Sequence, residues 1–158
     1  MTQVDFYTNA PDRLRTACRL CAKAVAAAAR VHVLVADADA AVRLSRLLWT
    51  TPATGFVPHC NAADPLAAVT PVIVDHRTDA FVHDDVLINL GDGVPDGFSR
   101  FRRLIEIVSA GDADRAAARD RYRHYRDRGY ALNTHDLAAP RQGSSAASKS
   151  GSAAAPES

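Results

Sequence analysis

The sequence predicts a three-layer α/β domain with a mostly parallel sheet. Short apolar, β-branched segments such as Val31–Ala36 and Val86–Leu90 are typical of strands that are buried on both faces. They alternate with longer segments whose apolar residues recur every three or four positions, as in amphipathic helices. Such alternation favours parallel strands joined by helical crossovers. The composition, 158 residues with 47% hydrophobic and 23% charged, is that of an ordinary globular domain.

Two strands and two helices are expected in the first third of the chain. A short strand around Val4–Tyr7 precedes a helix over about Pro11–Ala29. The strand Val31–Ala36 follows, and then a helix over about Asp39–Trp49. Apolar residues at helical spacing mark the faces expected to be buried, which are Leu14, Cys18, Cys21, Val25 and Ala28 in the first helix and Leu44, Leu47 and Leu48 in the second.

Strands and helices are expected to continue alternating after residue 55. Proline lies within the segments Phe56–Cys60 and Val69–Val74, so both are expected to be edge or irregular strands, because proline cannot donate to a β-ladder. The last helix, Asp112–Arg128, is expected to end at Gly129, which suits a helix cap. Between Val74 and Asp112 we expect, in order, a core strand at Val86–Leu90, a short helix at Phe98–Arg103 and a strand at Leu104–Val108.

The chain divides into a body, residues 1–137, and a tail, residues 138–158. The tail is rich in Ala and Ser and has no large apolar side chain, so it is expected to be flexible. The first residues do not resemble a secretory signal, and no apolar run approaches the roughly 20 residues needed to cross a bilayer. We therefore expect a cytoplasmic protein without membrane contact, with Cys18, Cys21 and Cys60 as free thiols.

The near-neutral total charge conceals two regions of opposite charge. The chain has 19 basic and 18 acidic residues, and leaving out the tail's Arg141, Lys149 and Glu157 gives 17 of each. Residues 115–128 hold six Arg and two Asp, a local charge of +4, so the rest of the body has 11 basic and 15 acidic residues. This distribution argues against a uniformly basic nucleic-acid binder and singles out one basic helix.

The sequence contains no convincing nucleotide or metal motif. It lacks GxGxxG and GxxxxGK[ST], and the glycines of residues 91–93 have no Lys behind them. Cys18 and Cys21 have the CxxC spacing of redox or zinc sites, to which His59 and Cys60 could add ligands. Because the cysteine pair lies on the apolar stripe of a helix, we favour burial in the core and expect no metal and no cofactor.

Asp37 and Asp39 provide an enzymatic alternative. They follow a strand in a pattern that resembles haloacid-dehalogenase-type phosphatases, where the first Asp is the nucleophile and the second is the acid/base. That chemistry needs a Mg²⁺-binding acidic pair after a later strand, whereas Asp84 and Asp85 precede theirs. We favour the interpretation that Asp37 or Asp39 caps the following helix.

The last helix carries a stripe of bases around an aromatic residue. The stripe, at steps of four, three and four, consists of Arg115, Arg119, Tyr122 and Arg126. Arg123 borders it, while Asp120 and Asp127 are expected to project to another side. Guanidinium groups bind carboxylates bidentately, so with Val108 nearby the stripe suits an acidic peptide that carries an apolar anchor. A phosphate-contacting helix that binds nucleic acid directly is the alternative.

A second candidate surface follows the second helix. Trp49, Pro52 and Phe56 fall in a loop and an edge-like strand, where large apolar groups often serve as interface anchors. A tryptophan that covers the core locally is an equally good interpretation.

Four ordered motifs together resemble a known family. They are Asp5-Phe6-Tyr7, Leu48-Trp49-x-x-Pro52-x-x-x-Phe56-Val57-Pro58-His59, Asp85-Val86-Leu87-Ile88-Asn89-Leu90, and Arg119-x-Arg121-Tyr122-Arg123-x-Tyr125-Arg126-x-x-Gly129-Tyr130-x-Leu132-Asn133. In this order, over residues 1–137, they are similar to the chi subunit of bacterial DNA polymerase III. The resemblance implies a mononucleotide-binding-like α/β fold without a phosphate loop.

The resemblance also implies a function in DNA replication. It implies a non-catalytic accessory subunit of the clamp-loader complex that joins the psi subunit to the acidic C-terminal tail of single-stranded DNA-binding protein. Nucleic acid is then contacted mainly indirectly, and any nucleotidyltransferase activity belongs to the polymerase holoenzyme. The implied tail site is Val108, Arg115, Arg119, Tyr122, Arg123 and Arg126, and the implied psi surface is Trp49, Pro52 and Phe56.

Two departures from the family pattern accompany the resemblance. Arg115 and Arg123 stand where relatives commonly have Lys, which keeps the charge but changes the donor geometry. The Ala/Ser-rich tail is an addition to the pattern.

Overall fold

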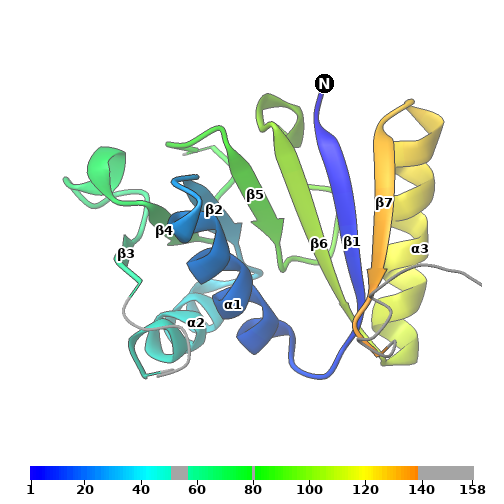
Figure 1. Cartoon of the computed structure of the whole chain (residues 1–158), viewed down its shortest axis with the longest axis horizontal. Helices are drawn as coiled ribbons and strands as arrows, with labels where there is room; N and C mark the ends of the chain where they lie inside the picture. The colour runs from blue at the N-terminus through cyan, green and yellow to red at the C-terminus, as the bar shows by residue number, and fades with distance from the viewer. Residues whose placement is uncertain (51–56, 80, 139–158) are drawn as a thin grey trace, which may run out of the picture.

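The computed structural model describes residues 1–50, 57–79 and 81–138 (Figure 1). The strands are β1 (Gln3–Ala10), β2 (Val31–Leu34), β3 (His59–Cys60), β4 (Val72–Asp75), β5 (Val86–Asn89), β6 (Arg103–Ser109) and β7 (Ala131–Asp136). The helices are α1 (Arg13–Ala26), α2 (Ala38–Thr50) and α3 (Asp112–Asp127), with short 3₁₀ helices η2 (Ala67–Val69) and η3 (Phe98–Arg100). Pro52, Phe56 and tail residues 139–158 lie outside the described residues.

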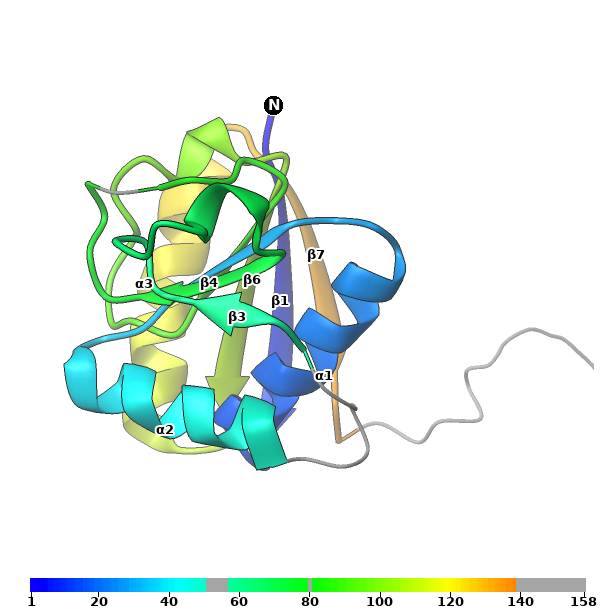
Figure 2. The same ribbon diagram turned by 90° about the vertical axis from the view of Figure 1, so that its left-hand side faces the viewer.

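The strands form one parallel sheet in the order β3-β4-β2-β5-β6-β1-β7. Helix α1 lies on one face of the sheet and α3 on the other (Figure 2). Helix α2 joins the α1 side, since its Leu44 and Leu48 share a buried cluster with Cys18 and Cys21 of α1. The predicted three-layer α/β fold is therefore confirmed. None of the helices in the described ranges combines the length and hydrophobicity that a membrane crossing requires.

One expectation about the sheet needs correction, and one strand was not expected. The segment expected to be an edge or irregular strand at Val69–Val74 forms β4, which is not at the edge but lies between β3 and β2. Pro71 comes just before β4, so its missing N–H does not interrupt the strand. Its carbonyl oxygen accepts a hydrogen bond from the backbone N–H of Val31 at 2.8 Å. Strand β7 was not expected, since its sequence, ALNTHD, is mostly polar and exposed. It is the edge strand beside β1.

The helices match the expected ranges with small corrections. Ala28 was expected on the buried stripe of the first helix, but it lies beyond the end of α1, exposed and with φ of 62°. The helix expected at Phe98–Arg103 is only η3, because Arg103 already begins β6. Gly129 follows α3 with φ of 83°, so the predicted glycine cap is confirmed.

A buried polar network fixes α3 against the sheet. Glu106 of β6 has no exposed surface and accepts hydrogen bonds from Asn89 Nδ2 at 3.0 Å, Arg121 Nε at 3.1 Å and Tyr125 Oη at 2.6 Å. Arg121 also donates to the carbonyl oxygen of Asp92 at 3.1 Å. Burial raises the pKa of Glu106, while the charge of Arg121 and these hydrogen bonds oppose that shift. The network ties α3 to β6, β5 and the loop after β5.

Replacing Arg121 by Leu should destabilise the protein far more than the same change at Arg123. Arg121 is 3% exposed and its loss leaves a buried carboxylate without its cation, a situation that costs about 3–5 kcal/mol. Arg123 lies two residues away on the same helix with its side chain 55% exposed. Urea unfolding of both variants measures the difference, and equal free energies of unfolding would contradict the role of the network.

A buried histidine lies in β2. His32 has no exposed surface, and neither ring nitrogen has a hydrogen-bond partner among the described residues. Its ring packs edge-on against Phe81, with centroids 4.7 Å apart. Burial lowers the pKa of His32 to about 4 from its ordinary value of 6.5, against the opposing charge of Asp75. The neutral ring is therefore the form that the core accommodates.

Acidification should destabilise the protein through His32. A depressed folded-state pKa gives full stability above pH 6.5, which is lost as the pH falls from about 6.5 to 4, a total of about 3 kcal/mol. The His32→Leu variant should lose less stability over this range, while His76→Gln, a change at an exposed ring, should behave as wild type. Urea unfolding at pH 7.5 and 4.5 tests this, and parallel losses in wild type and His32→Leu would refute it.

Candidate functional site

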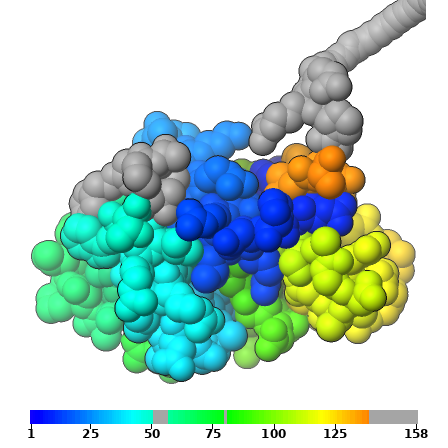
Figure 3. All heavy atoms as spheres, turned by 90° about the horizontal axis from the view of Figure 1, so that it is seen from below, coloured from blue at the N-terminus to red at the C-terminus, as the bar shows by residue number. Residues whose placement is uncertain are grey.

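At the carboxyl edge of the sheet, where α/β proteins usually bind ligands, the N-termini of α1 and α2 are capped by the chain's own carboxylates. Asp12 accepts a hydrogen bond from Arg15 N at the start of α1, at 3.1 Å, and Asp37 accepts one from Ala40 N at the start of α2, at 2.8 Å. These helix ends are the places where a phosphate would bind. Figure 3 shows this edge, with the helices crowded around the strand ends. The geometry accounts for the missing phosphate-loop glycines.

The predicted capping role of Asp37 is confirmed, and the phosphatase arrangement is not formed. Asp84 and Asp85 precede β5, so they lie at the amino edge of the sheet, opposite Asp37. Asp85 accepts a hydrogen bond from the backbone N–H of Arg30 at 2.9 Å. The acids that would have to converge on Mg²⁺ are therefore at opposite ends of the parallel strands.

The cysteines do not form a metal site. Cys18 and Cys21 are buried in the core, as predicted, and burial raises the pKa of Cys18 to about 11 and that of Cys21 still further. Cys60 is on β3 and is also a free thiol. Within the described ranges, no three His, Cys, Asp or Glu side chains are close enough together to hold a metal ion.

A groove of about 290 Å³ lies between α3 and the sheet, and we call it the α3 groove. Its lining residues are Phe6, Thr8, Asn9, Val108, Arg115, Ala118, Arg119, Tyr122 and Thr134. Four residues that the sequence placed in one candidate site, Val108, Arg115, Arg119 and Tyr122, therefore lie around one cavity. Arg115 and Arg119 are exposed on its helical wall.

The floor of the α3 groove is apolar. Phe6, Val108 and Ala118 are 2%, 2% and 6% exposed. The Tyr122 ring packs against Phe6 at a centroid distance of 5.4 Å, tilted by 58°. Two guanidinium groups above an aromatic floor can receive a carboxylate and an apolar side chain together.

Arg123 and Arg126 do not line the groove and have acidic neighbours. Arg123 forms an ion pair with Asp120, and Arg126 approaches Asp127 at 3.3 Å. One residue of the basic stripe, Arg126, therefore has an acidic partner despite the expected projection of Asp127 to another side. The pairs are exposed and weak, because water screens them and both side chains lose freedom.

Arg121 was also counted from the sequence in the local charge of +4 of the last helix. Its side chain is buried against the sheet and forms an ion pair with Glu106. The exposed charge of this helix is therefore smaller than the local +4 suggested by the sequence.

The strand side of the α3 groove was not anticipated. Thr8 and Asn9 come from the end of β1, where the pairing with β6 shifts register between Tyr7 and Ala10. Asn9 has φ of 57° and donates from Nδ2 to Asp136 Oδ1 at 2.9 Å. Thr134 comes from β7. No periodic signal in the sequence marks β7, so these neighbours could be found only from the structure.

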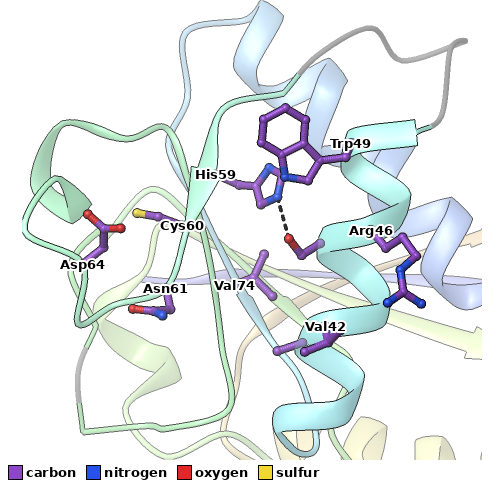
Figure 4. Close-up of a pocket in the computed structure, with 10 residues that line it drawn as sticks. Val42, Arg46, Trp49, His59, Cys60, Asn61, Asp64 and Val74 are labelled. Atoms are coloured by element: carbon purple, nitrogen blue, oxygen red, sulfur yellow. Dashed lines mark hydrogen bonds between the residues drawn. The ribbon is translucent and has the colours of Figure 1, made fainter.

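A second and larger groove, of about 600 Å³, lies between α2 and β3 and contains Trp49 (Figure 4). The Trp49 side chain is 65% exposed, and its ring meets that of His59 at a centroid distance of 5.8 Å. Ser45 Oγ and His59 Nε2 are 2.9 Å apart, which joins α2 to β3. Val42 and Arg46 complete the α2 wall (Figure 4). We call this cavity the α2 groove.

Comparison with known proteins identifies the family. The family model described as "DNA polymerase III chi subunit, HolC" matches residues 1–133. The chain is 37% identical to DNA polymerase III subunit chi of Pseudomonas aeruginosa over 141 residues, which cover 87% of this chain and 98% of that protein. It is 32% identical to the Escherichia coli subunit over 118 residues, or 74% and 80% of the two chains.

A third relative is the chi subunit of Haemophilus influenzae, which is 28% identical over 122 residues, or 77% of this chain and 85% of that protein. The match of the family model to most of the body agrees with the four ordered motifs and with the α/β fold that holds them. The chain therefore belongs to the DNA polymerase III chi subunit family.

Proposed function

We propose that this chain is a non-catalytic adaptor of the DNA polymerase III clamp-loader complex, acting in the bacterial cytoplasm. In this proposal it joins the psi subunit to the acidic C-terminal tail of single-stranded DNA-binding protein and contacts nucleic acid mainly through these partners. The observation that carries the proposal is the α3 groove, where Arg115 and Arg119 stand above an apolar floor. Residues 1–137 form the adaptor domain, and the tail after them is an appendage.

The α3 groove suits a peptide terminus that is both acidic and apolar. A cavity of about 290 Å³ can hold one large side chain on Phe6, Val108 and Tyr122. A carboxylate beside that side chain can receive bidentate hydrogen bonds from Arg119 or Arg115. Arg123 and Arg126 each form only a weak, exposed ion pair with a neighbouring aspartate. They can give up these pairs to bind the acidic residues further along the peptide. Affinity should therefore be modest and should fall as salt is added.

The α2 groove is the proposed docking surface for psi. Trp49 presents a large exposed apolar surface beside Val42, which is 55% exposed, and such residues are typical interface anchors. The two grooves lie on different elements, α2 with β3 and α3 with β1 and β7. One chain can therefore hold both partners at once and tether the polymerase to coated single-stranded DNA.

Arg119→Ala should weaken binding of an acidic tail peptide ending in Phe by roughly tenfold, because it removes a charge-assisted hydrogen bond to the carboxylate. Isothermal titration calorimetry at low and high salt measures the loss. Arg19→Ala, at an exposed position on α1, is the matched control and should leave affinity unchanged.

Two results of this titration would count against the tail site. One is equal affinity in wild type and Arg119→Ala. The other is full competition by naked single-stranded DNA, which would favour the direct nucleic-acid binder instead.

Trp49→Ala should abolish or strongly reduce co-purification of psi, since it removes the largest exposed apolar side chain of the α2 groove. Val69→Ala is the control, because Val69 is 70% exposed but lies outside that groove. Tail-peptide binding should be retained in both variants. Normal psi recovery with Trp49→Ala would place the psi surface elsewhere.

A further inference from the structure

The α3 groove has a cationic end and an anionic end. We infer that this polarity sets the direction of the bound acidic peptide: its terminal residue lies in the groove and the preceding residues run along α3 toward Arg126, away from Asp136. The inference rests on the proposed tail-binding function and adds to it the path of the peptide. Asp136, whose carboxylate marks the anionic end, and Asn9, which donates a hydrogen bond to it, were not among the predicted site residues.

The anionic end lies where β1 and β7 finish. Asp136 is the register partner of Thr8, which lines the groove, and its carboxylate accepts hydrogen bonds from Asn9 Nδ2 and from the backbone N–H of Ala138, both at 2.9 Å. These contacts hold the pKa of Asp136 below its ordinary value, so the group is charged at neutral pH. Figure 3 shows the end of β7 beside β1 and the start of α3.

The acidic side chains at the start of α3 increase this negative charge. Asp112 and Asp114 lie in the first turn of the helix, and Asp114 accepts a hydrogen bond from Ser109 N at 2.7 Å. Arg115 faces the groove near this end, and Arg13 approaches Asp114 at 3.7 Å. An acidic peptide that left the groove past Asp136 would therefore meet three carboxylates and only two guanidinium groups.

The opposite end of α3 presents exposed guanidinium groups. Arg126 lies seven residues beyond Arg119 on the same stripe, and Arg128 follows at the helix end. Their acidic neighbour Asp127 is exposed and held only weakly by Arg126. The carboxylates of an acidic peptide that left the groove in this direction would replace the weak Arg126–Asp127 pair with new ion pairs to these guanidinium groups.

The dimensions of the helix fix an expected register. Seven residues of α-helix rise about 10 Å, which three residues of extended peptide span. With the terminal carboxylate at Arg119, the side chain three residues before the terminal one reaches Arg126. An aspartate at that peptide position should therefore interact with Arg126 specifically.

Nuclear magnetic resonance with a spin-labelled peptide tests the direction. The probe is a synthetic peptide with three Asp, two Gly and a C-terminal Phe, which carries a nitroxide on a cysteine added at its N-terminus. In the ¹⁵N-labelled full chain we expect the nitroxide to broaden amide signals of residues 126–130 and to spare those of residues 8–10 and 136–138. The opposite pattern, or equal broadening at both ends, would overturn the inference.

A double-mutant cycle tests the register. Arg126→Ala should weaken binding of the peptide about threefold, and this loss should disappear when the Asp three residues before the terminal Phe is replaced by Asn. Equal losses for both peptides, or none, would overturn the register. The proposed function is tested separately from the direction of the peptide. If an unlabelled peptide shifts no signals around Phe6, Val108 and Tyr122, the groove does not bind acidic tails.

Discussion

The buried carboxylate of Glu106 is the group on which the candidate binding face depends. It lies on β6, between β5 and β1, and binds Arg121 and Tyr125, which are four residues apart on α3. A buried charge is tolerated only when its partners are held in place, so the helix has one rotation and one height at which both contacts form. That rotation turns Arg121 inward and turns Arg115, Arg119 and Tyr122 toward the groove above Phe6. The interior ion pair thus orients the exterior bases.

In this three-layer α/β fold the helix N-termini at the carboxyl edge of the sheet are capped by the chain's own carboxylates. Asp12 and Asp37 occupy the helix N-termini that would otherwise attract a phosphate. The cavities of about 290 and 600 Å³ lie along the sides of α3 and α2, against opposite ends of the sheet. Grooves lined by exposed Arg and Trp side chains are suited to segments of other proteins. The proposed adaptor function requires two such surfaces that can be occupied together.

Much of the fold and part of the candidate site could be predicted because both follow from local periodicity. The spacing of Leu44 and Leu48, and of Arg115 and Arg119, places each pair on one helix face whatever the tertiary structure is. Strand β7 escaped prediction because an exposed edge strand needs no apolar alternation, and with it the strand wall of the groove, including Thr134, was missed. The inward turn of Arg121 also escaped, because its partner Glu106 is 15 residues away in the sequence.

The sequence by itself determined the parallel α/β class, the absence of a phosphate loop, the basic stripe of the last helix and membership of the chi family through its ordered motifs. These properties depend on residue type and on spacing within single segments. Only the tertiary structure decided which arginines are exposed, that β4 is internal, and that the ends of β1 and β7 place Asn9 and Asp136 beside the groove. Those outcomes depend on which distant segments pair, because a charge is neutralised or exposed by its neighbours in space and not by its neighbours in sequence.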